Sequence, residues 1–150
     1  MKTIVLISCS KKKAETKQPA ELLYQKSPLF SKSMRYAKEV VRADEIFILS
    51  ALHGLVELDQ ELAPYNVTLQ RAKKSVKQEW AAPVLESIKE KADIEKDKFV
   101  LLAGEDYIEF LEPHFKNCEV PMRGLQQGDR LKWLNKKLGI KKNERSIFKQ

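Results

Sequence analysis

Apolar residues in this chain gather into short runs that alternate with longer amphipathic segments. The first two runs, Thr3–Ser8 and Glu45–Leu49, are hydrophobic almost throughout and rich in β-branched residues. A third run at Lys98–Ala103 has the same character, and a shorter one follows at Asn117–Val120. Runs of this length and composition are typical of strands buried on both faces of a parallel sheet. The pattern therefore predicts four strands.

The segments between these runs carry apolar residues at a spacing typical of helices with one buried face. Pro83 interrupts the longest of these segments and predicts either a kink or two shorter helices there. Strands that alternate with helices favour a parallel sheet covered on both faces. We expect one α/β domain over residues 1–150, a three-layer α/β/α sandwich with a mostly parallel four-stranded sheet. The predicted helices are Leu29–Arg42, Gln70–Lys91, Tyr107–Phe115 and Asp129–Leu138.

Polar residues follow the end of each predicted strand. Ligands of open α/β sheets bind in the crevice outside the carboxyl ends of the strands. Because parallel strands place these ends at the same edge, the residues that follow them are expected to converge. The segments predicted to meet there are Cys9-Ser10-Lys11, Ser50 to Gly54, Gly104 to Tyr107 and Arg123-Gly124.

The chain carries a net charge of +7, with 28 Lys and Arg residues against 21 Asp and Glu. This balance favours a polyanionic partner, and a nucleic acid or a nucleotide is the first candidate. Lysine also accumulates on solvated helix faces, so composition alone leaves nucleic-acid binding open. The charge therefore adds weight to a nucleic-acid partner without deciding it.

Several classes of protein are disfavoured by what the sequence lacks. No apolar run reaches the roughly 18 residues that span a bilayer, and the N-terminal run is too short for a signal peptide. We therefore expect a cytoplasmic protein without membrane contact. Cys9 and Cys118 lack metal-ligand spacing and are expected to be free thiols. With only two His residues, and with neither a P-loop nor a dinucleotide fingerprint, we expect no metal and no cofactor.

Three residues near the predicted strand ends are candidates for catalysis. His53 can transfer protons or stabilise charge, because an imidazole titrates near neutral pH. It can equally be a loop residue that only forms hydrogen bonds. Asp59 and Asp106 are rival carboxylates, either of which could activate water or stabilise a sugar cation. Asp106 is equally suited to capping the helix that begins at Tyr107.

The candidate binding residues follow the same strand ends. Ser10 and Lys11 combine a hydroxyl with a run of lysines, which suits a phosphate. Tyr65 and Tyr107 can stack on a base, although tyrosines at the edge of a core give the same pattern. Cys9 is better suited to packing than to nucleophilic attack. The full set of candidates for substrate contact is Cys9, Ser10, Lys11, Ser50, Gly54, Tyr65, Gly104, Tyr107 and Arg123.

Two pieces of the sequence, Cys9-Ser10-Lys11-Lys12-Lys13 and Ser50-Ala51-Leu52-His53-Gly54-Leu55, resemble a family of small, largely uncharacterised bacterial and phage proteins. The resemblance includes Arg123 to Leu134 and covers nearly the whole chain. More distantly, the chain is similar to a domain of archaeosine synthase and to the uracil-DNA glycosylase superfamily. This similarity implies a uracil-DNA glycosylase-like fold that handles a nucleobase. The Gly-Gln-Asp-Pro-Tyr loop and the leucine wedge of classical uracil-DNA glycosylases are absent.

The leading hypothesis is therefore a hydrolase that cleaves the N-glycosidic bond of a modified base, with DNA favoured over RNA. Asp59 or Asp106 would activate water, and His53 would stabilise the leaving base. Arg123 would join Ser10 and Lys11 in holding phosphates. Two alternatives stay open: a non-catalytic module that binds nucleic acid or a nucleotide, and a deoxyribosyltransferase-type enzyme for free nucleosides. The sequence identifies neither the base nor the oligomeric state.

Overall fold

The computed structural model describes residues 1–140, and its centre is a five-stranded sheet in the order β4-β3-β1-β6-β7. The four predicted strands are present and lie parallel to one another. The fifth, β4, pairs antiparallel with β3, so the prediction of only four strands was wrong. The strands are β1 (Thr3–Ser8), β3 (Glu45–Ser50), β4 (Gly54–Glu57), β6 (Lys98–Leu102) and β7 (Asn117–Glu119).

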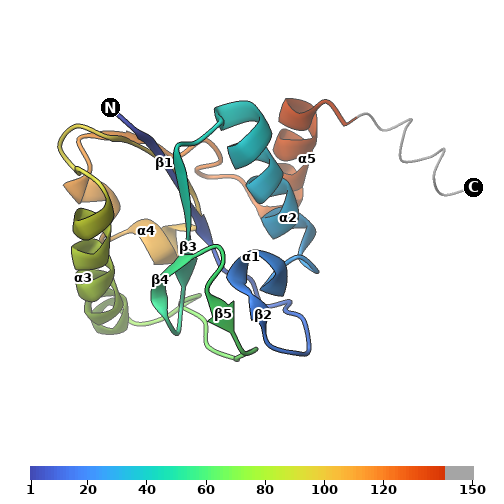
Figure 1. Cartoon of the computed structure of the whole chain (residues 1–150), viewed down its shortest axis with the longest axis horizontal. Coiled ribbons are helices and arrows are strands. Elements are labelled where there is room, and N and C mark those ends of the chain that lie inside the picture. The colour runs from blue at the N-terminus through green and yellow to red at the C-terminus, as the bar shows by residue number, and fades with distance from the viewer. Residues whose placement is uncertain (141–150) are drawn as a thin grey trace, which may run out of the picture.

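Helices cover both faces of this sheet, as Figure 1 shows. Successive side chains of a strand point to opposite faces, so Ile4 and Leu6 of β1 pack in one core and Val5 and Ile7 in the other. The first core includes residues of α3 (Lys74–Lys91) and α4 (Glu105–Ile108). The second includes residues of α1 (Ala20–Leu23), α2 (Pro28–Arg35) and α5 (Gln127–Leu138).

The predicted helices are present, with differences at positions that contain proline or an unusual turn. Leu29–Arg42 divides into α2 and a π-helical segment, η1 (Tyr36–Val41). Pro83 lies inside α3, which remains one helix. The predicted helix at Tyr107–Phe115 is instead α4 followed by a 3₁₀ turn, η2 (Glu112–His114). Pro113 lies within that turn and has no amide hydrogen to continue an α-helix.

The stretch after β3 forms a hairpin, which the sequence analysis missed. Ser50 pairs with Gly54, and Phe47 pairs with Glu57, so β4 runs back along β3. Gly54 has φ +74, and a Cβ placed there would lie 3.2 Å from Cγ2 of Val84 on α3. Glycine meets both conditions, since it tolerates a positive φ and allows close packing. A small second sheet pairs β2 (Gln18–Pro19) with β5 (Glu61–Leu62).

The strand order also locates the crevice of the sheet. The chain passes from β1 to β3 on one side, and later returns to the other side of β1 to form β6. The order of the parallel strands therefore reverses at β1. Ligands of such sheets bind outside the carboxyl ends of the strands at this reversal, which here lies beside Cys9 and Ser10.

Candidate functional site

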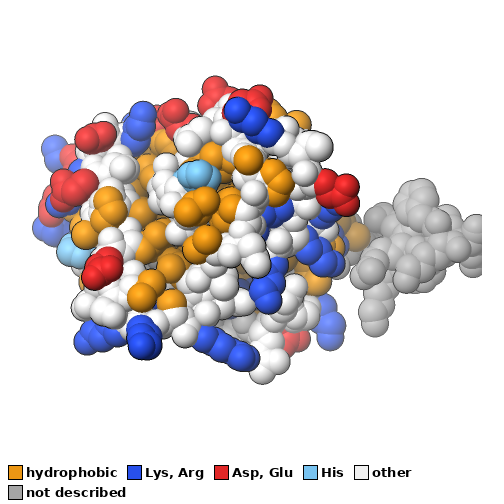
Figure 2. All heavy atoms as spheres, turned by 90° about the horizontal axis from the view of Figure 1, so that it is seen from below, with side chains coloured by type: hydrophobic (Ala, Val, Ile, Leu, Met, Phe, Trp, Pro, Cys, Tyr) orange, Lys and Arg blue, Asp and Glu red, His pale blue; other side chains and the backbone are white. Residues whose placement is uncertain are grey.

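The carboxyl ends of β1, β3 and β6 share one edge of the sheet because these strands pair in parallel, and β1 and β3 point downward in Figure 1. Figure 2 shows the molecule from that side: a histidine lies near the centre among hydrophobic side chains, and charged side chains of both signs lie around the rim. The predicted convergence of the first three strand ends is confirmed by the parallel pairing. Two features occupy this edge, a cluster of tyrosines and a small pocket beside β1.

A chain of hydroxyl groups forms the centre of the tyrosine cluster, which we define as Cys9, Tyr24, Ser50, Tyr65 and Tyr107. The Tyr65 hydroxyl lies 2.8 Å from Ser50 Oγ and 2.7 Å from the Tyr24 hydroxyl. Ser50 Oγ also accepts the backbone N–H of His53 at 3.0 Å. Ser50 and Tyr24 are fully buried. These bonds fix the Tyr65 ring over the end of β3.

Cys9 joins the cluster from β1. Its Sγ lies 3.4 Å from the Tyr107 hydroxyl, and its backbone N–H donates to Leu49 O at the end of β3. The Tyr107 hydroxyl in turn accepts the Leu69 N–H at 3.4 Å. The Cys9 thiol is half-buried and forms no disulfide. It is therefore held among phenol groups at the reversal of the strand order.

Burial sets the protonation of this cluster. It raises the pKa of Tyr24 to about 12. Burial likewise raises the pKa of Tyr65 and that of Tyr107, and the nearby Cys9 adds to both shifts. Because desolvation disfavours the charged form of a phenol, all three tyrosines stay neutral near pH 7. Neutral phenols can donate a hydrogen bond to a ligand.

Lys13 covers the cluster from the loop after β1. Its Nζ lies 4.5 Å from the centre of the Tyr65 ring and 5.9 Å from that of Tyr24. A cation over an aromatic face is attracted by the ring quadrupole. Burial lowers the pKa of Lys13, while the nearby Cys9 acts in the opposite direction. The ammonium group thus sits partly desolvated beside the thiol.

His53 forms the exposed wall of the cluster. Its ring packs edge-on against Tyr65, with 5.5 Å between the ring centres. No residue among 1–140 forms a hydrogen bond with its ring nitrogens, because the only bond of His53 is that of its backbone N–H to Ser50. The imidazole of His53 is therefore open to solvent and to a ligand.

Trp80 supports the cluster from α3. Its Nε1 donates to Ser50 O at 2.9 Å, and its ring packs edge-on against Tyr107 at 5.7 Å between centres. The end of β3 is thus held from both faces of the sheet, by Trp80 on one face and Tyr65 on the other. Trp80 lies within the predicted helix Gln70–Lys91, and no feature of the sequence indicates this contact.

The two candidate acids lie in different places. Asp106 is at this edge, in the first turn of α4, where its carboxylate accepts Arg71 N–H at 3.1 Å and Lys77 Nζ at 3.2 Å. Glu109 and then Asp106 raise the pKa of Lys77. Asp59 follows β4, which carries the chain back along β3 by about 3.4 Å per residue. The hairpin therefore separates exposed Asp59 from His53.

The second feature is a small pocket between the ends of β1 and β6, which we call the switch-point pocket. Its volume is about 40 Å³. Its polar lining comes from Cys9, Ser10, Ser27, Ser33 and Arg130, together with Ser8. The remaining walls are apolar. The sequence analysis predicted Ser10 as a contact here, but gave no signal for Ser33, which lies in the middle of a helix.

The other candidate binding residues either contact neighbouring residues of the chain or are exposed to solvent. Arg123 is paired with Glu105 at 2.9 Å and also with Glu112. Lys11 is exposed, and its carbonyl accepts Lys13 Nζ at 3.2 Å. Gly104 lies beside the Arg130 guanidinium, and an added Cβ would be 3.8 Å from it. Gly54 serves the hairpin described above.

Two classes of site are missing from the part of the chain that the structure describes. Residues 1–140 contain no group of three or more His, Cys, Asp and Glu that could hold a metal ion. Among the same residues, no helix has the length and hydropathy needed to cross a membrane.

Comparison with known families identifies the chain as a member of a family of unknown function, DUF6884, whose model matches residues 4–136. The matched region includes both the tyrosine cluster and the switch-point pocket. Comparisons with curated proteins and with solved structures give no match.

Proposed function

We propose that this protein is a nucleobase-handling enzyme, an N-glycosidase that hydrolyses the bond between a modified base and its sugar in DNA. The observation that carries the proposal is the tyrosine cluster, in which bonded hydroxyls hold the neutral Tyr65 ring against an open His53 at the carboxyl edge of the sheet. The parallel sheet between helix layers is compatible with the uracil-DNA glycosylase-like fold that the sequence resemblance implies.

In this proposal the base lies against the exposed His53 and the rim of Tyr65. A base that an enzyme processes leaves the DNA stack and enters a pocket lined by aromatic and polar groups. Cleavage of the glycosidic bond leaves negative charge on the departing base. Donors fixed in advance at that position stabilise the charge without reorganisation, and His53 is the donor that solvent reaches.

The sugar develops positive charge in the same step, and a carboxylate stabilises it. Asp106 is the candidate carboxylate at this edge. Its bonds to Arg71 and Lys77 leave lone pairs free, because a carboxylate can accept about four hydrogen bonds. Asp59, beyond the hairpin, takes no part in this version of the mechanism.

The test is a panel of duplex and single-stranded DNA that carries modified bases, treated with alkali to reveal abasic sites. We expect cleavage of at least one member. His53→Ala and Asp106→Asn should each reduce the rate by about 10²-fold, as loss of a charge-stabilising group does. Glu90→Gln, which changes an exposed carboxylate on α3, should react at the wild-type rate.

A panel without cleavage would overturn the proposal. Equal activity of wild type and His53→Ala would remove His53 from it. Loss in Asp59→Asn with full activity in Asp106→Asn would transfer the role of the carboxylate to Asp59. Release of base from free nucleosides alone would instead indicate a deoxyribosyltransferase-type enzyme.

The second candidate is a module that binds nucleic acid without chemistry. It is favoured by the fact that Asp106 already holds two donors. A module of this kind binds DNA with strong salt dependence, and Lys11→Ala weakens the binding while Asp106→Asn does not.

A further inference from the structure

The switch-point pocket is suited to a small anion. A single water needs roughly 10–15 Å³ of such space, so a volume of about 40 Å³ accepts a group of a few heavy atoms. A nucleobase is too large for it. The pocket's charged residue is Arg130, and no Asp or Glu lines it.

Arg130 enters the pocket without an acidic partner. Its Nε donates to Leu125 O at 2.9 Å, which fixes the side chain. Its two terminal nitrogens lie beside Gly104. Across residues 1–140 no carboxylate pairs with it, whereas the nearby Arg123 is paired with two glutamates. A planar guanidinium with free terminal N–H groups matches the geometry of a phosphate.

Ser33 supplies an independent observation. Its side chain is only 2% exposed, and it lines the pocket. Its hydroxyl has no hydrogen-bond partner among the described residues, although Ser31, on the same helix, bonds to Pro28 O. The hydroxyl oxygen is not fully enclosed, since the fully buried side-chain oxygen without a partner among residues 1–140 is Oε2 of Glu45, so Ser33 Oγ stays accessible from the pocket that the residue lines. A ligand oxygen in the pocket would give this hydroxyl its partner.

The start of α2 adds a backbone donor. The first amides of a helix have no acceptor within the helix. Ser27 Oγ accepts the Phe30 N–H, and Pro28 has no amide hydrogen. Leu29 also lines the pocket, and its backbone N–H has no acceptor among residues 1–140. The positive end of the helix dipole favours an anion at this point.

We propose that the switch-point pocket binds the terminal phosphate of a nucleotide or of a phosphorylated DNA end. Arg130, Ser33 and the Leu29 amide donate to its oxygens. The small volume of the pocket, about 40 Å³, suits a phosphate with one ester link. Cys9 belongs to both the pocket and the tyrosine cluster, and the nucleoside therefore extends toward Tyr65.

The test is calorimetric titration of the full chain at constant ionic strength, with chloride as the balancing anion. The probes are inorganic phosphate, deoxyadenosine 5′-monophosphate and deoxyadenosine. We expect the monophosphate to bind at least tenfold more tightly than the nucleoside. Ser33→Ala should weaken the binding of inorganic phosphate by about tenfold, and Arg130→Gln should weaken it more, since bonds to charged groups are the stronger ones.

Matched controls separate the pocket from general positive charge. Arg35→Gln removes an exposed arginine of α2 that is paired with Glu39 outside the pocket, and Ser31→Ala removes a neighbouring serine hydroxyl of α2. Both should bind phosphate as the wild type does. Equal losses in Arg35→Gln and Arg130→Gln, or no binding of phosphate by the wild type, would overturn the inference. Ser33→Ala keeps the test valid if Arg130→Gln does not fold, because it removes a hydroxyl without a partner.

Two oligodeoxynucleotides distinguish the sources of the phosphate. One carries a 5′-phosphate and the other a 5′-hydroxyl. A preference for the phosphorylated strand that disappears in Ser33→Ala assigns the pocket to a DNA end. Binding of the monophosphate without such a preference assigns it to a free nucleotide. None of these measurements depends on glycosidase turnover, so the proposed function and the phosphate site succeed or fail separately.

Discussion

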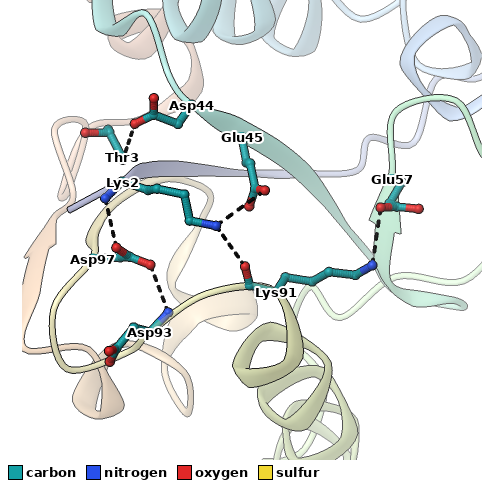
Figure 3. A network of polar contacts seen from close by, with 8 residues as sticks. All are labelled: Lys2, Thr3, Asp44, Glu45, Glu57, Lys91, Asp93 and Asp97. Atoms are coloured by element: carbon teal, nitrogen blue, oxygen red, sulfur yellow. Dashed lines mark hydrogen bonds and ion pairs between the residues drawn. The ribbon is translucent and has the colours of Figure 1, made fainter.

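At the amino edge of the sheet, acidic side chains are bonded to the backbone of neighbouring strands, whereas the carboxyl edge places cations and hydroxyls around a crevice. Figure 3 shows the amino edge. Asp97, before β6, accepts the backbone N–H groups of Lys2 and Asp93 at 2.8 Å each. Asp44, before β3, accepts the Thr3 N–H at 2.7 Å. Both acids thus hold the start of β1 against its neighbours.

Charged side chains complete the amino edge. Lys2 Nζ contacts Glu45 at 3.5 Å and donates to Lys91 O at 3.1 Å. Lys91 Nζ lies 3.4 Å from Glu57 on β4. Among residues 1–140, Oε2 of Glu45 is an exception, because it is buried without a partner. At the carboxyl edge, by contrast, Lys13 and Arg130 have no carboxylate partner among residues 1–140.

The difference between the two edges suggests that residues at the amino edge serve mainly stability, whereas the unpaired cations at the carboxyl edge serve ligand binding. Bonds at the amino edge are made within the chain, so their loss lowers stability and leaves ligand binding intact. Lys13 and Arg130 at the carboxyl edge are held in place without a carboxylate partner among residues 1–140, so their loss should cost little stability and affect a ligand. The predictions below test this division, starting with the largest expected change in stability.

Asp97→Ala should give the largest loss, about 3 kcal/mol in the free energy of unfolding. The side chain is 5% exposed, and hydrogen bonds to charged groups contribute roughly 1.5–3 kcal/mol each. Denaturation in urea measures the loss. Asp97→Asn, which keeps one acceptor oxygen, should lose about half as much. A loss of phosphate binding in folded Asp97→Ala would break the division between the edges.

The same residue predicts a pH dependence. Bonds to the backbone N–H groups of Asp93 and then Lys2 lower the pKa of Asp97 from its ordinary value of 3.8. A lowered pKa means that the stabilisation is complete above 3.8 and is lost as the pH falls through the folded-state value. Wild type should therefore lose stability below pH 3.8 by a step that Asp97→Ala lacks. Parallel acid titrations of the two proteins would show a single shared curve if this reasoning is incorrect.

Gly54→Ala should cost about 2 kcal/mol. The residue has a positive φ and faces Val84 of α3. A left-handed conformation costs a residue with a Cβ roughly 1–2 kcal/mol, and crowding in a packed core adds to this. Thermal unfolding measures the change. Gly128→Ala, with nothing within 4 Å of the added Cβ, is the matched control and should stay close to wild type.

Gly54 lies at the carboxyl edge, yet Gly54→Ala is expected to lower stability because the residue supports the hairpin. The variant therefore tests whether the two edges of the sheet differ in every residue or only in some. Position along the chain does not decide whether a residue serves stability or function. What decides is whether its contacts are made within the protein. Wild-type stability in Gly54→Ala would show that the hairpin relaxes and that the β3–β4 turn is not strained.

Ser50→Ala should cost about 1 kcal/mol, close to the net contribution of an ordinary hydrogen bond. The variant leaves the Tyr65 hydroxyl bonded to Tyr24 but removes the acceptor of the His53 N–H. Under the proposed function, the loss in base-release rate should correspond to a larger free energy than the loss in stability, because Tyr65 and His53 lose their common support. A rate equal to wild type would show that the two side chains keep their positions without Ser50.

The sequence predicts β1, β3 and β6 because each is a run of largely buried side chains, and their parallel pairing brings Cys9, Ser50 and Tyr107 together. The fourth parallel strand, β7, is short and mostly exposed. The sequence does not predict β4. Gly54–Glu57 is short, and Gly54 was interpreted as a position for ligand approach rather than as a hairpin residue. Without the hairpin, Asp59 was expected near His53. The structure instead carries Asp59 away from His53, because β4 runs back along β3.

Other site residues give no sequence signal of their role. Ser33 lies on an amphipathic helix, where a serine is ordinary. Tyr24 is fully buried, and it follows the short segment Ala20–Leu23, which gives no signal of a site. Their importance arises from the packing of α2 and α5 against the end of β1, which depends on contacts between residues far apart in the chain.

Gly104→Ala should change stability by less than about 0.5 kcal/mol, as substitutions without strain commonly do. Gly104 has φ −76 and ψ 164, which alanine adopts freely. The added Cβ would lie 3.8 Å from Arg130 Nη1, an ordinary contact. Phosphate affinity should therefore also stay near wild type, in contrast to Arg130→Gln. Paired unfolding and phosphate titrations decide the matter: a large loss of affinity at wild-type stability would show that the pocket extends over Gly104, and that the carboxyl edge admits its ligand along β6 as well as β1.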